Sequence, residues 1–245
     1  MREWIYGRNP VYEVLRAGRR DAFQLLVAEG AQDKGRLGEI LRLAAKKKLI
    51  VIRVPRQKLD RINTGNQGVA LEAAGYPYSS LDEMLVLAEE RQQKPFILIL
   101  DALQDPQNLG TLLRTAEAVG VHGIMLPLRQ AAMVSPAVVA ASSGASEHML
   151  VTQANLAQAI TILKDENIWV VGLDGGPDSQ SPDQVRLDGS VALVVGNEGQ
   201  GMRRLVRESC DLLLRLPMRG NVESLNAAVA GSVALYFAWG ARGFK

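Results

Sequence analysis

The fold is decided by the stretch Leu193-Val194-Val195-Gly196-Asn197-Glu198-Gly199-Gln200-Gly201. Its first three residues are apolar and are typical of a buried strand, and a helix is expected at about 202–209. The three glycines allow a tight turn and a close approach of backbone to a ligand. A turn at a helix N-terminus also presents unpaired N–H groups and a positive dipole end. The stretch therefore predicts either a simple strand-to-helix turn or a ligand-binding loop.

Strand and helix patterns alternate on both sides of this stretch. Strands are expected at 96–100, 122–126, 168–173, 191–195 and 212–216, with helices at 109–119, 135–147 and 224–239. The strand at 96–100 is wholly apolar, as expected where a parallel sheet is buried on both faces. The alternation predicts an α/β domain over 95–245, in which helices cover an open parallel sheet.

Residues 1–75 are predicted to form a smaller α/β domain, joined through a linker with a charged helix at 76–94. Helices are expected at 8–18, 37–47 and 56–62, and strands at 23–28, 49–54 and 69–73. This part carries 15 Lys and Arg against 8 Asp and Glu, whereas the remainder carries 13 against 18. A basic surface of this kind either attracts phosphate backbones or is simply solvated.

Composition excludes several classes of protein. The single cysteine, Cys210, excludes an intramolecular disulfide, and with only two histidines no Cys/His zinc cluster can form, so no metal is expected. This fits a reducing, cytoplasmic setting. We expect no signal peptide and no membrane association, because the N-terminus lacks an apolar core and the uncharged run 226–240 is short. A nicotinamide-dependent dehydrogenase is disfavoured, because G-x-G-x-x-G after the first strand is absent.

Two further motifs accompany the glycine-rich turn. Asp105-Pro106-Gln107-Asn108-Leu109-Gly110, with Arg114, follows the strand at 96–100, and Leu216-Pro217-Met218 through Ser224-Leu225-Asn226 follows the strand at 212–216. In open parallel sheets, ligands bind just beyond the carboxyl ends of the strands. All three motifs occupy such positions, which predicts one shared site.

Single residues of these motifs also have purely structural interpretations. Asn108 and Ser224 could be helix N-caps, and Met218 could fill a gap in the core. Arg114 lies ~140° around its helix from Leu109, away from the apolar stripe, so it could be solvated or could reach into a cleft. The residues alone leave these alternatives open.

Together, in order and spacing, the three motifs resemble those of the SpoU/TrmH group of SPOUT RNA ribose 2′-O-methyltransferases. The segments Ile5–Val11 and Gln67–Val69 resemble the substrate-binding domain of that family, which has a fold like a ribosomal RNA-binding protein. The two-domain layout is most similar to the RlmB-type branch, which modifies a guanosine ribose in large-subunit (23S) rRNA. Asn66 departs from the family pattern, where histidine is frequent before Gln-Gly, and this weakens the assignment of an exact RNA.

The resemblance implies S-adenosylmethionine as methyl donor, rRNA as the partner, a homodimer and a trefoil knot in the C-terminal sheet. The residues it implies for donor binding are Gly196, Asn197, Gly201, Leu216, Met218 and Leu225. Those it implies for catalysis are Arg114, Asn108, Glu198, Ser224 and Asn226. A tRNA ribose methyltransferase and a non-catalytic RNA-binding protein with this fold are the alternatives.

In this family the residue matching Arg114 is proposed as the base that activates the 2′-hydroxyl. Arginine stays protonated in almost every protein setting, so we expect a different role. Arg114 would clamp the adjacent phosphate and orient the hydroxyl, while a phosphate oxygen or water accepts the proton. Asn108 and Glu198 would order Arg114 and the RNA.

Overall fold

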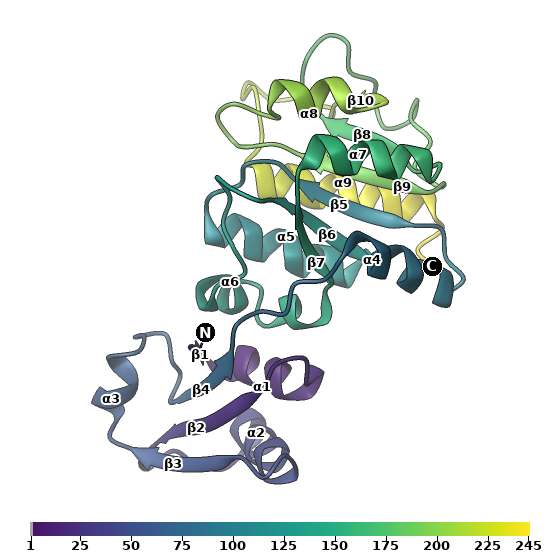
Figure 1. Ribbon diagram of the computed structural model, residues 1–245. Coiled ribbons are helices and arrows are strands. Elements are labelled where there is room, and N and C mark those ends of the chain that lie inside the picture. The colour runs from purple at the N-terminus through teal and green to yellow at the C-terminus, as the bar shows by residue number, and fades with distance from the viewer. Residues whose placement is uncertain (1) are drawn as a thin grey trace. The chain divides into compact units, whose positions relative to one another are not determined.

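The computed structural model describes residues 2–245, which divide into two compact units (Figure 1). Unit 1 comprises the chain up to Pro77 together with Met133–His148, and unit 2 comprises Tyr78–Ala132 and Met149–Lys245. The segment 133–148 was expected in the C-terminal domain, so unit 1 is built from two separate stretches of chain.

Unit 1 contains a four-stranded mixed sheet. Its strands are β1 (Arg2–Tyr6), β2 (Ala22–Ala28), β3 (Ile50–Val54) and β4 (Val69–Ala74), in the order β1-β4-β2-β3. β4 runs antiparallel to both neighbours, whereas β2 and β3 are parallel. Its first helices are α1 (Arg8–Ala17), α2 (Gly35–Lys46) and α3 (Arg56–Asp60). β1 was not predicted, because a five-residue strand is recognisable only through its pairing with β4.

The second stretch of unit 1 contains α6 (Pro136–Ala141) and the 3₁₀-helix η1 (Ala145–His148). The single helix expected at 135–147 is therefore wrong. The chain breaks at Ser143 and Gly144, whose φ angles of 55° and 89° do not continue a helix. A Cβ atom at Gly144 would lie 2.6 Å from the Cβ of Glu13 in α1, so glycine allows this close packing.

A buried ionic network joins the two stretches of unit 1. The guanidinium of Arg20 is fully buried and donates to both carboxylate oxygens of Glu147, each at 2.8 Å, and it also pairs with Glu3. The hydroxyl of Tyr76 donates to the Ser146 carbonyl at 3.1 Å, and burial raises the pKa of Tyr76 to about 12. Contacts far apart in sequence, rather than local pattern, thus place η1 in unit 1.

Unit 2 contains the predicted parallel sheet, with six strands in the order β10-β8-β9-β5-β6-β7. The strands are β5 (Phe96–Leu100), β6 (Gly123–Pro127), β7 (Val151–Ala154), β8 (Trp169–Leu173), β9 (Val191–Val195) and β10 (Leu212–Leu214). Every residue of β5, β6 and β9 is buried, which confirms the reading of their apolar runs. β7 and the helix after it were not predicted.

Helices cover both faces of this sheet (Figure 1). They are α4 (Leu81–Glu90), α5 (Pro106–Ala118), α7 (Leu156–Asp165), α8 (Arg204–Ser209) and α9 (Ala227–Ala241). α4, α7 and α8 share one apolar cluster with the sheet. α5 and α9 pack closely at Gly231 of α9. A Cβ at this position would lie 2.6 Å from the side chain of Leu112 and 3.1 Å from that of Val195, so only glycine allows this approach. Within residues 2–245, no helix is long and apolar enough to cross a bilayer.

His122 holds the amino-terminal end of this sheet together. Its side chain is buried, its Nδ1 accepts a hydrogen bond from the Phe96 N–H at 3.0 Å, and its Nε2 lies 3.0 Å from Oε1 of Gln93. This pairing requires a neutral ring, with the proton on Nε2. Burial, followed by the nearby charges of Arg91 and Arg242, lowers the pKa of His122 to about 4.

We therefore expect stability to fall as the pH drops from about 6.5 towards 4. In that window the unfolded chain binds a proton at this histidine and the folded chain does not, so the free energy of unfolding decreases by up to about 1.4 kcal/mol per pH unit. Urea unfolding at pH 7, 5.5 and 4.5 measures this slope. His122→Gln should show a flatter slope than the wild type, and equal slopes would contradict the assignment.

Candidate active site

Three loops follow strands at the carboxyl edge of the unit 2 sheet. Residues 101–105 follow β5, 196–203 follow β9, and 215–226 follow β10. β5 and β9 are adjacent and in register, with Leu100 opposite Val195, so the first two loops begin side by side. The three sequence motifs thus occupy one edge, as the strand order requires.

One polar residue from each motif meets at this edge. Nδ2 of Asn108 donates to Oε1 of Glu198 at 2.5 Å. Nδ2 of Asn226 donates to the same oxygen and, at 3.2 Å, to Oδ1 of Asn108. Glu198 therefore accepts from two amides that come from segments far apart in sequence, and the three side chains form a polar cluster, hereafter the Asn–Glu–Asn cluster.

The helix starts explain why these amides are available. Asp105, not Asn108, is the N-cap of α5 and accepts from the Gln107 N–H at 3.0 Å, with Pro106 in the first turn. Asn226, not Ser224, is the N-cap of α9, and its Oδ1 accepts from the Ala228 and Val229 N–H groups. The N-cap interpretations of Asn108 and Ser224 are therefore wrong. Capping also fixes the amide of Asn226 so that its NH₂ group faces Glu198.

The glycine-rich turn is closed on itself. The N–H of Asn197 donates to the Gly201 carbonyl and the N–H of Gly201 to the Asn197 carbonyl, both at 2.9 Å. The Asn197 side chain donates to the Ala102 carbonyl and accepts from the Gly199 N–H, also at 2.9 Å. Any Cβ at Gly196 would lie 2.6 Å from the Gly201 carbonyl oxygen and would overlap backbone there. α8 begins only at Arg204, two residues later than expected.

Asp101 is a site residue that the sequence reasoning missed. Its carboxylate is fully buried and accepts from the Arg203 backbone N–H and from Nε of Arg203, both at 2.7 Å. Its own N–H donates to the Val195 carbonyl at 2.8 Å. Asp101 therefore fastens the end of the glycine-rich turn to β5. The available signal was a carboxylate placed directly after a wholly apolar strand.

The loop before α9 leaves its backbone open. Met218, Ser224 and Leu225 are exposed, and Leu216 is partly buried. Within residues 2–245, no backbone–backbone hydrogen bond involves the segment 216–225. Its N–H and C=O groups are therefore available to a polar ligand, beside apolar side chains that could cover a flat ring.

Arg114 lies in the middle of α5, six residues beyond Asn108, and its side chain is exposed. The prediction that it points away from the apolar stripe is consistent with this, because Leu109, Leu112, Leu113 and Ala116 are the buried residues of the helix. Ser224 lies three residues before α9 and takes no part in the hydrogen bonds of the Asn–Glu–Asn cluster.

Comparison with known families matches both parts of the chain. Residues 95–236 match the model of the SpoU rRNA Methylase family. Residues 4–79 match the model described as RNA 2′-O ribose methyltransferase substrate binding. The chain belongs to the SpoU/TrmH family of RNA methyltransferases.

Curated relatives of this family match over nearly their whole length. A Bacillus subtilis protein assigned to the TrmH family of tRNA/rRNA methyltransferases, YacO, is 44% identical over 238 residues, covering 96% of this chain and 94% of its own. A Staphylococcus aureus protein of the same description is 42% identical and covers 95% of this chain and 93% of its own.

Solved structures share the fold. The SpoU methyltransferase AviRb from Streptomyces viridochromogenes, in complex with AdoMet, covers 100% of this chain and 92% of its own, with a TM-score of 0.81 at 23% identity. A TrmH-family protein from Porphyromonas gingivalis covers 97% and 89%, with a TM-score of 0.75 at 26% identity. The TrmH/SpoU tRNA modifying enzyme of A. aeolicus covers 67% and 86%, with a TM-score of 0.57 at 26% identity.

Asn66, where the sequence departs from the SpoU/TrmH pattern, is a structural residue. It is fully buried, and its Nδ2 donates to Asp60 and to the Asn63 carbonyl, both at 2.7 Å. Its Oδ1 accepts from the Gly68 N–H at 2.8 Å. Asn66 therefore shapes the turn at 63–68 from inside and presents no surface to an RNA.

Proposed function

We propose that this protein transfers a methyl group from S-adenosylmethionine to the 2′-hydroxyl of a guanosine in large-subunit rRNA. RNA methylation is the activity of its family. The observation that carries the proposal is the Asn–Glu–Asn cluster, in which the three motifs of the family meet at the carboxyl edge of the sheet.

The methyl donor would lie between the glycine-rich turn and the loop before α9. The residues proposed to hold it are Gly196, Asn197, Gly201, Leu216, Met218 and Leu225. The open backbone of 216–225 suits the polar edge of an adenine, and Met218 and Leu225 suit its faces. AviRb, which has the same fold, is solved in complex with AdoMet.

The donor supplies a methyl group on a positively charged sulfur, and the bond that forms is to the ribose 2′-oxygen while the hydroxyl proton leaves. Much of the acceleration comes from holding the two reacting atoms in line. Glu198, held by two amides, would order the RNA and Arg114. Arg114 would clamp a phosphate and orient the hydroxyl, and a phosphate oxygen or water would take the proton.

Ribosomal RNA is preferred to tRNA as substrate because of unit 1. The structure of the tRNA modifying enzyme covers only 67% of this chain, whereas a structure described as an rRNA methyltransferase, from Sinorhizobium meliloti, covers 97% of it. Unit 1 is the basic part of the chain and matches the family's substrate-binding model. An rRNA substrate and a single cysteine, which remains a free thiol, both favour a cytoplasmic location.

The test is transfer of labelled methyl from S-adenosylmethionine to unmodified rRNA and, separately, to tRNA, with nuclease digestion to locate the label. Label is expected on a guanosine ribose of rRNA and should be lost with Arg114→Ala. Arg114→Lys keeps the charge but loses the planar fork, so we expect turnover to fall on the order of tenfold.

Each other outcome of this assay contradicts a distinct part of the proposal. Near-normal turnover of Arg114→Lys would exclude the clamp, and label on tRNA alone would reassign the substrate. Donor binding without transfer to either RNA would indicate a ribosome assembly intermediate as substrate. Failure to bind the donor would favour a non-catalytic RNA-binding protein.

We further propose a homodimer formed through α9. Val229, Val233, Tyr236 and Phe237 recur at helical spacing and are exposed, while the opposite side of α9 packs on α5 and β9. Contiguous exposed apolar stripes of this kind mark interfaces. Sedimentation should give twice the 26.6 kDa chain mass, and Phe237→Glu should give the monomer. A monomeric wild type would exclude the dimer.

The trefoil knot expected in the C-terminal sheet stays a prediction.

A further inference from the structure

One face of the unit 1 sheet exposes apolar side chains to solvent. The face that carries the buried side chains Ile5, Leu25, Val27 and Leu71 lies under α1 and α2, although Val51 of the edge strand β3 is 39% exposed on this face. The opposite face is covered at one end, where Leu59 of α3 packs with Leu26 and Val54. Sheets with antiparallel pairs commonly pack one face on the core and leave the other solvated, and the solvated face is usually polar.

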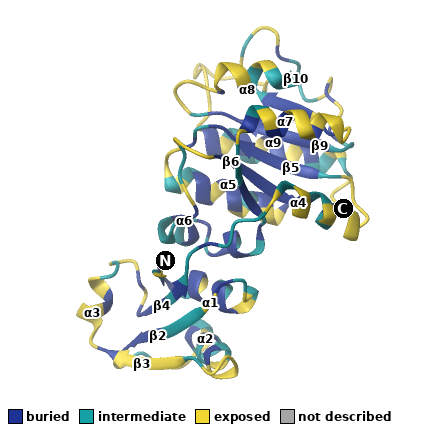
Figure 2. Ribbon diagram, viewed as in Figure 1, coloured by how far each residue is buried: buried dark blue, intermediate teal, exposed yellow. Residues whose placement is uncertain are grey.

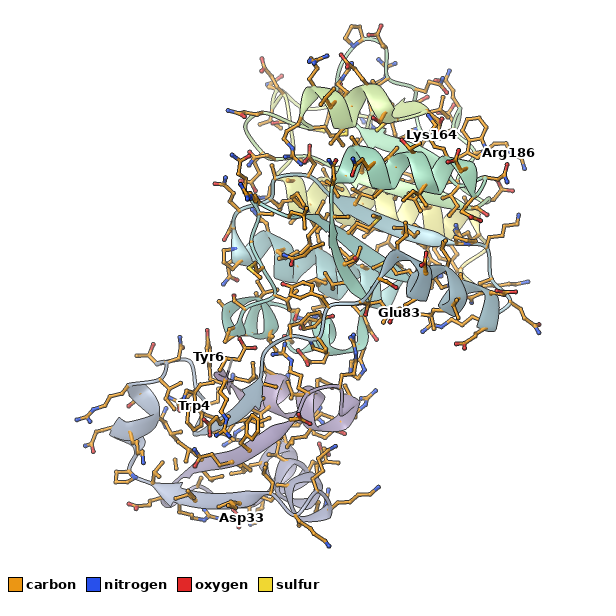
Figure 3. The ribbon with its side chains drawn as sticks, in the orientation of Figure 1. Trp4, Tyr6, Asp33, Glu83, Lys164 and Arg186 are labelled. Atoms are coloured by element: carbon orange, nitrogen blue, oxygen red, sulfur yellow. The ribbon has the colours of Figure 1, made fainter. Side chains whose placement is uncertain are left out.

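The strand register identifies which side chains occupy this second face. Trp4 and Gln24 both lie opposite Glu72 of β4. Ile50 lies opposite Gln24, and Ile52 opposite Leu26, in the parallel pair β2–β3. Trp4 and Tyr6 alternate with the buried Ile5, so they project from β1 to this same side (Figure 3). Trp4, Gln24, Ile50 and Ile52 define the open sheet face.

The open sheet face is apolar where it meets water. Ile50 is 65% exposed and Ile52 is 39% exposed, and Figure 2 shows β3 in the colour of exposed residues. β3 is an edge strand of the sheet, and isoleucine is among the residue types most often buried in proteins. Trp4 is of intermediate burial and packs against the cluster that contains Leu26 and Ala70.

Positive charge surrounds this apolar surface. Arg2 begins β1 and stacks over the Phe23 ring at 3.8 Å. Arg56, Lys58 and Arg61 are exposed in and directly after α3, where Asp60 lies 4.0 Å from Arg56 and offsets one of these charges. Glu72 is the carboxylate within the face, and it is already engaged by Gln24 at 2.7 Å and by Arg2 at 3.6 Å. The rim is thus suited to phosphates and the centre to flat, uncharged groups.

We propose that the open sheet face binds unpaired bases of the substrate RNA. Bases would stack on Trp4 and lie against Ile50 and Ile52, with Gln24 available to a base edge and the phosphates directed to Arg2 and α3. Stacking on aromatic side chains beside a basic rim is how sheets bind single-stranded nucleic acid. The inference rests on the proposed function, because it takes RNA as the substrate, and it selects a single-stranded region over a duplex.

The net positive charge of residues 1–75 favours RNA over a protein as the partner of this face. Residues 1–75 carry 15 Lys and Arg against 8 Asp and Glu, and the family model for substrate binding spans residues 4–79 and therefore all four strands from Trp4 onward. A second copy of the chain would have to bring the same basic rim against itself, which like charges disfavour.

Tryptophan fluorescence tests the contact directly. The chain has three tryptophans, so Trp169→Phe with Trp239→Phe leaves Trp4 as the only emitter. The matched control, Trp4→Phe with Trp239→Phe, leaves Trp169, which is 57% exposed and lies in unit 2. Each variant is titrated with a single-stranded rRNA oligonucleotide and with a duplex of the same sequence, and binding is followed independently by anisotropy of labelled RNA.

We expect the single strand to quench Trp4 in parallel with binding, the duplex to bind more weakly without quenching, and Trp169 to stay unchanged. Unchanged Trp4 emission at saturating RNA would overturn the proposal. Equal quenching of Trp4 and Trp169 would do the same, because it would indicate a non-specific effect.

A second pair of variants avoids disturbing the packed Trp4. Ile50→Glu with Ile52→Glu alters exposed side chains only, and Ile162→Glu on α7 is the matched control for a new surface charge. We expect the double variant to weaken RNA affinity and raise the KM for RNA about tenfold or more, with kcat and donor affinity unchanged. A KM equal to that of Ile162→Glu, or a changed sedimentation mass in place of a changed RNA affinity, would overturn the proposal.

These readouts separate the two proposals. If RNA quenches Trp4 but the protein does not bind S-adenosylmethionine, the proposed function fails and the binding face stands. If methyl is transferred normally by the Ile50→Glu, Ile52→Glu variant at low RNA concentration, the binding face fails and the proposed function stands.

Discussion

Gly196→Ala is expected to weaken methyl-donor binding strongly. The new Cβ would lie 2.6 Å from the Gly201 carbonyl oxygen, and even closer to the Gly201 carbonyl carbon and the Met202 nitrogen. These are backbone atoms that cannot rotate away, so the turn must open and release the paired Asn197 and Gly201 hydrogen bonds. Titration calorimetry with S-adenosylmethionine should show an affinity lower by about a hundredfold or more, equivalent to about 2.7 kcal/mol.

Gly199→Ala is the matched control, since it places the same substitution in the same turn. A Cβ there would meet only Oδ1 of Asn197 at 3.8 Å, an ordinary contact, and the backbone is not left-handed. We expect donor affinity within a few-fold of the wild type. If Gly196→Ala folds and binds the donor as well as Gly199→Ala, the glycine-rich turn is not the donor site.

Glu147→Ala should cost about 3–5 kcal/mol of stability, because it leaves the buried Arg20 guanidinium without its bidentate partner. Arg20 and Glu147 are both almost completely buried, so water cannot replace the lost carboxylate. The loss is a large share of the ~5–15 kcal/mol that stabilises a typical protein. Urea unfolding measures it, and amide exchange should show the loss of protection in α1, β1 and η1 first.

Glu208→Ala removes a carboxylate of the same type from an exposed i,i+4 pair with Arg204. Such pairs contribute roughly 0.3–0.5 kcal/mol, so this variant should unfold almost like the wild type. Arg20→Met combined with Glu147→Leu should recover much of the lost stability, because it removes both buried charges. Equal, small losses in Glu147→Ala and Glu208→Ala would show that the network does not hold unit 1 together.

The parallel sheet could be predicted because its central strands are recognisable from their own residues, without knowledge of their neighbours in the sheet. Phe96–Leu100 and Val191–Val195 are unbroken apolar runs, and the structure begins and ends them at the predicted residues. Their helices were placed less well. Asp105-Pro106 is itself a helix-start signal, and using it would have begun α5 at Pro106 rather than at 109.

Local pattern could not place residues 133–148. The break at Ser143 and Gly144 has a signal, since Ser-Ser-Gly ends helices readily, but the membership of η1 in unit 1 has none. It depends on Arg20 and Glu147, which lie 127 residues apart. β1 was missed for the same reason, because its existence depends on pairing with β4.

The edge of the sheet at which the site lies was predictable, but the hydrogen bonds within the site were not. Strand order places Asn108, Glu198 and Asn226 near one another, and the structure joins them by hydrogen bonds. Which amide faces the carboxylate depends on Asn226 serving as the cap of α9. From residue type alone, Ser224 was an equally good candidate for that cap. Asp101 was overlooked because its partner, Arg203, is 102 residues away.

The discontinuity of unit 1 also affects its synthesis. Glu147 follows Arg20 by 127 residues. A ribosome that adds ~5–20 residues per second would therefore add Glu147 to the chain about 6–25 s after Arg20. During that interval the nascent RNA-binding unit carries a cation whose buried partner has not yet been made. It can reach its final form only after much of the methyltransferase unit has left the exit tunnel. A fusion protein that contains only residues 1–79 would lack Glu147 altogether, so the buried Arg20 would remain without this partner.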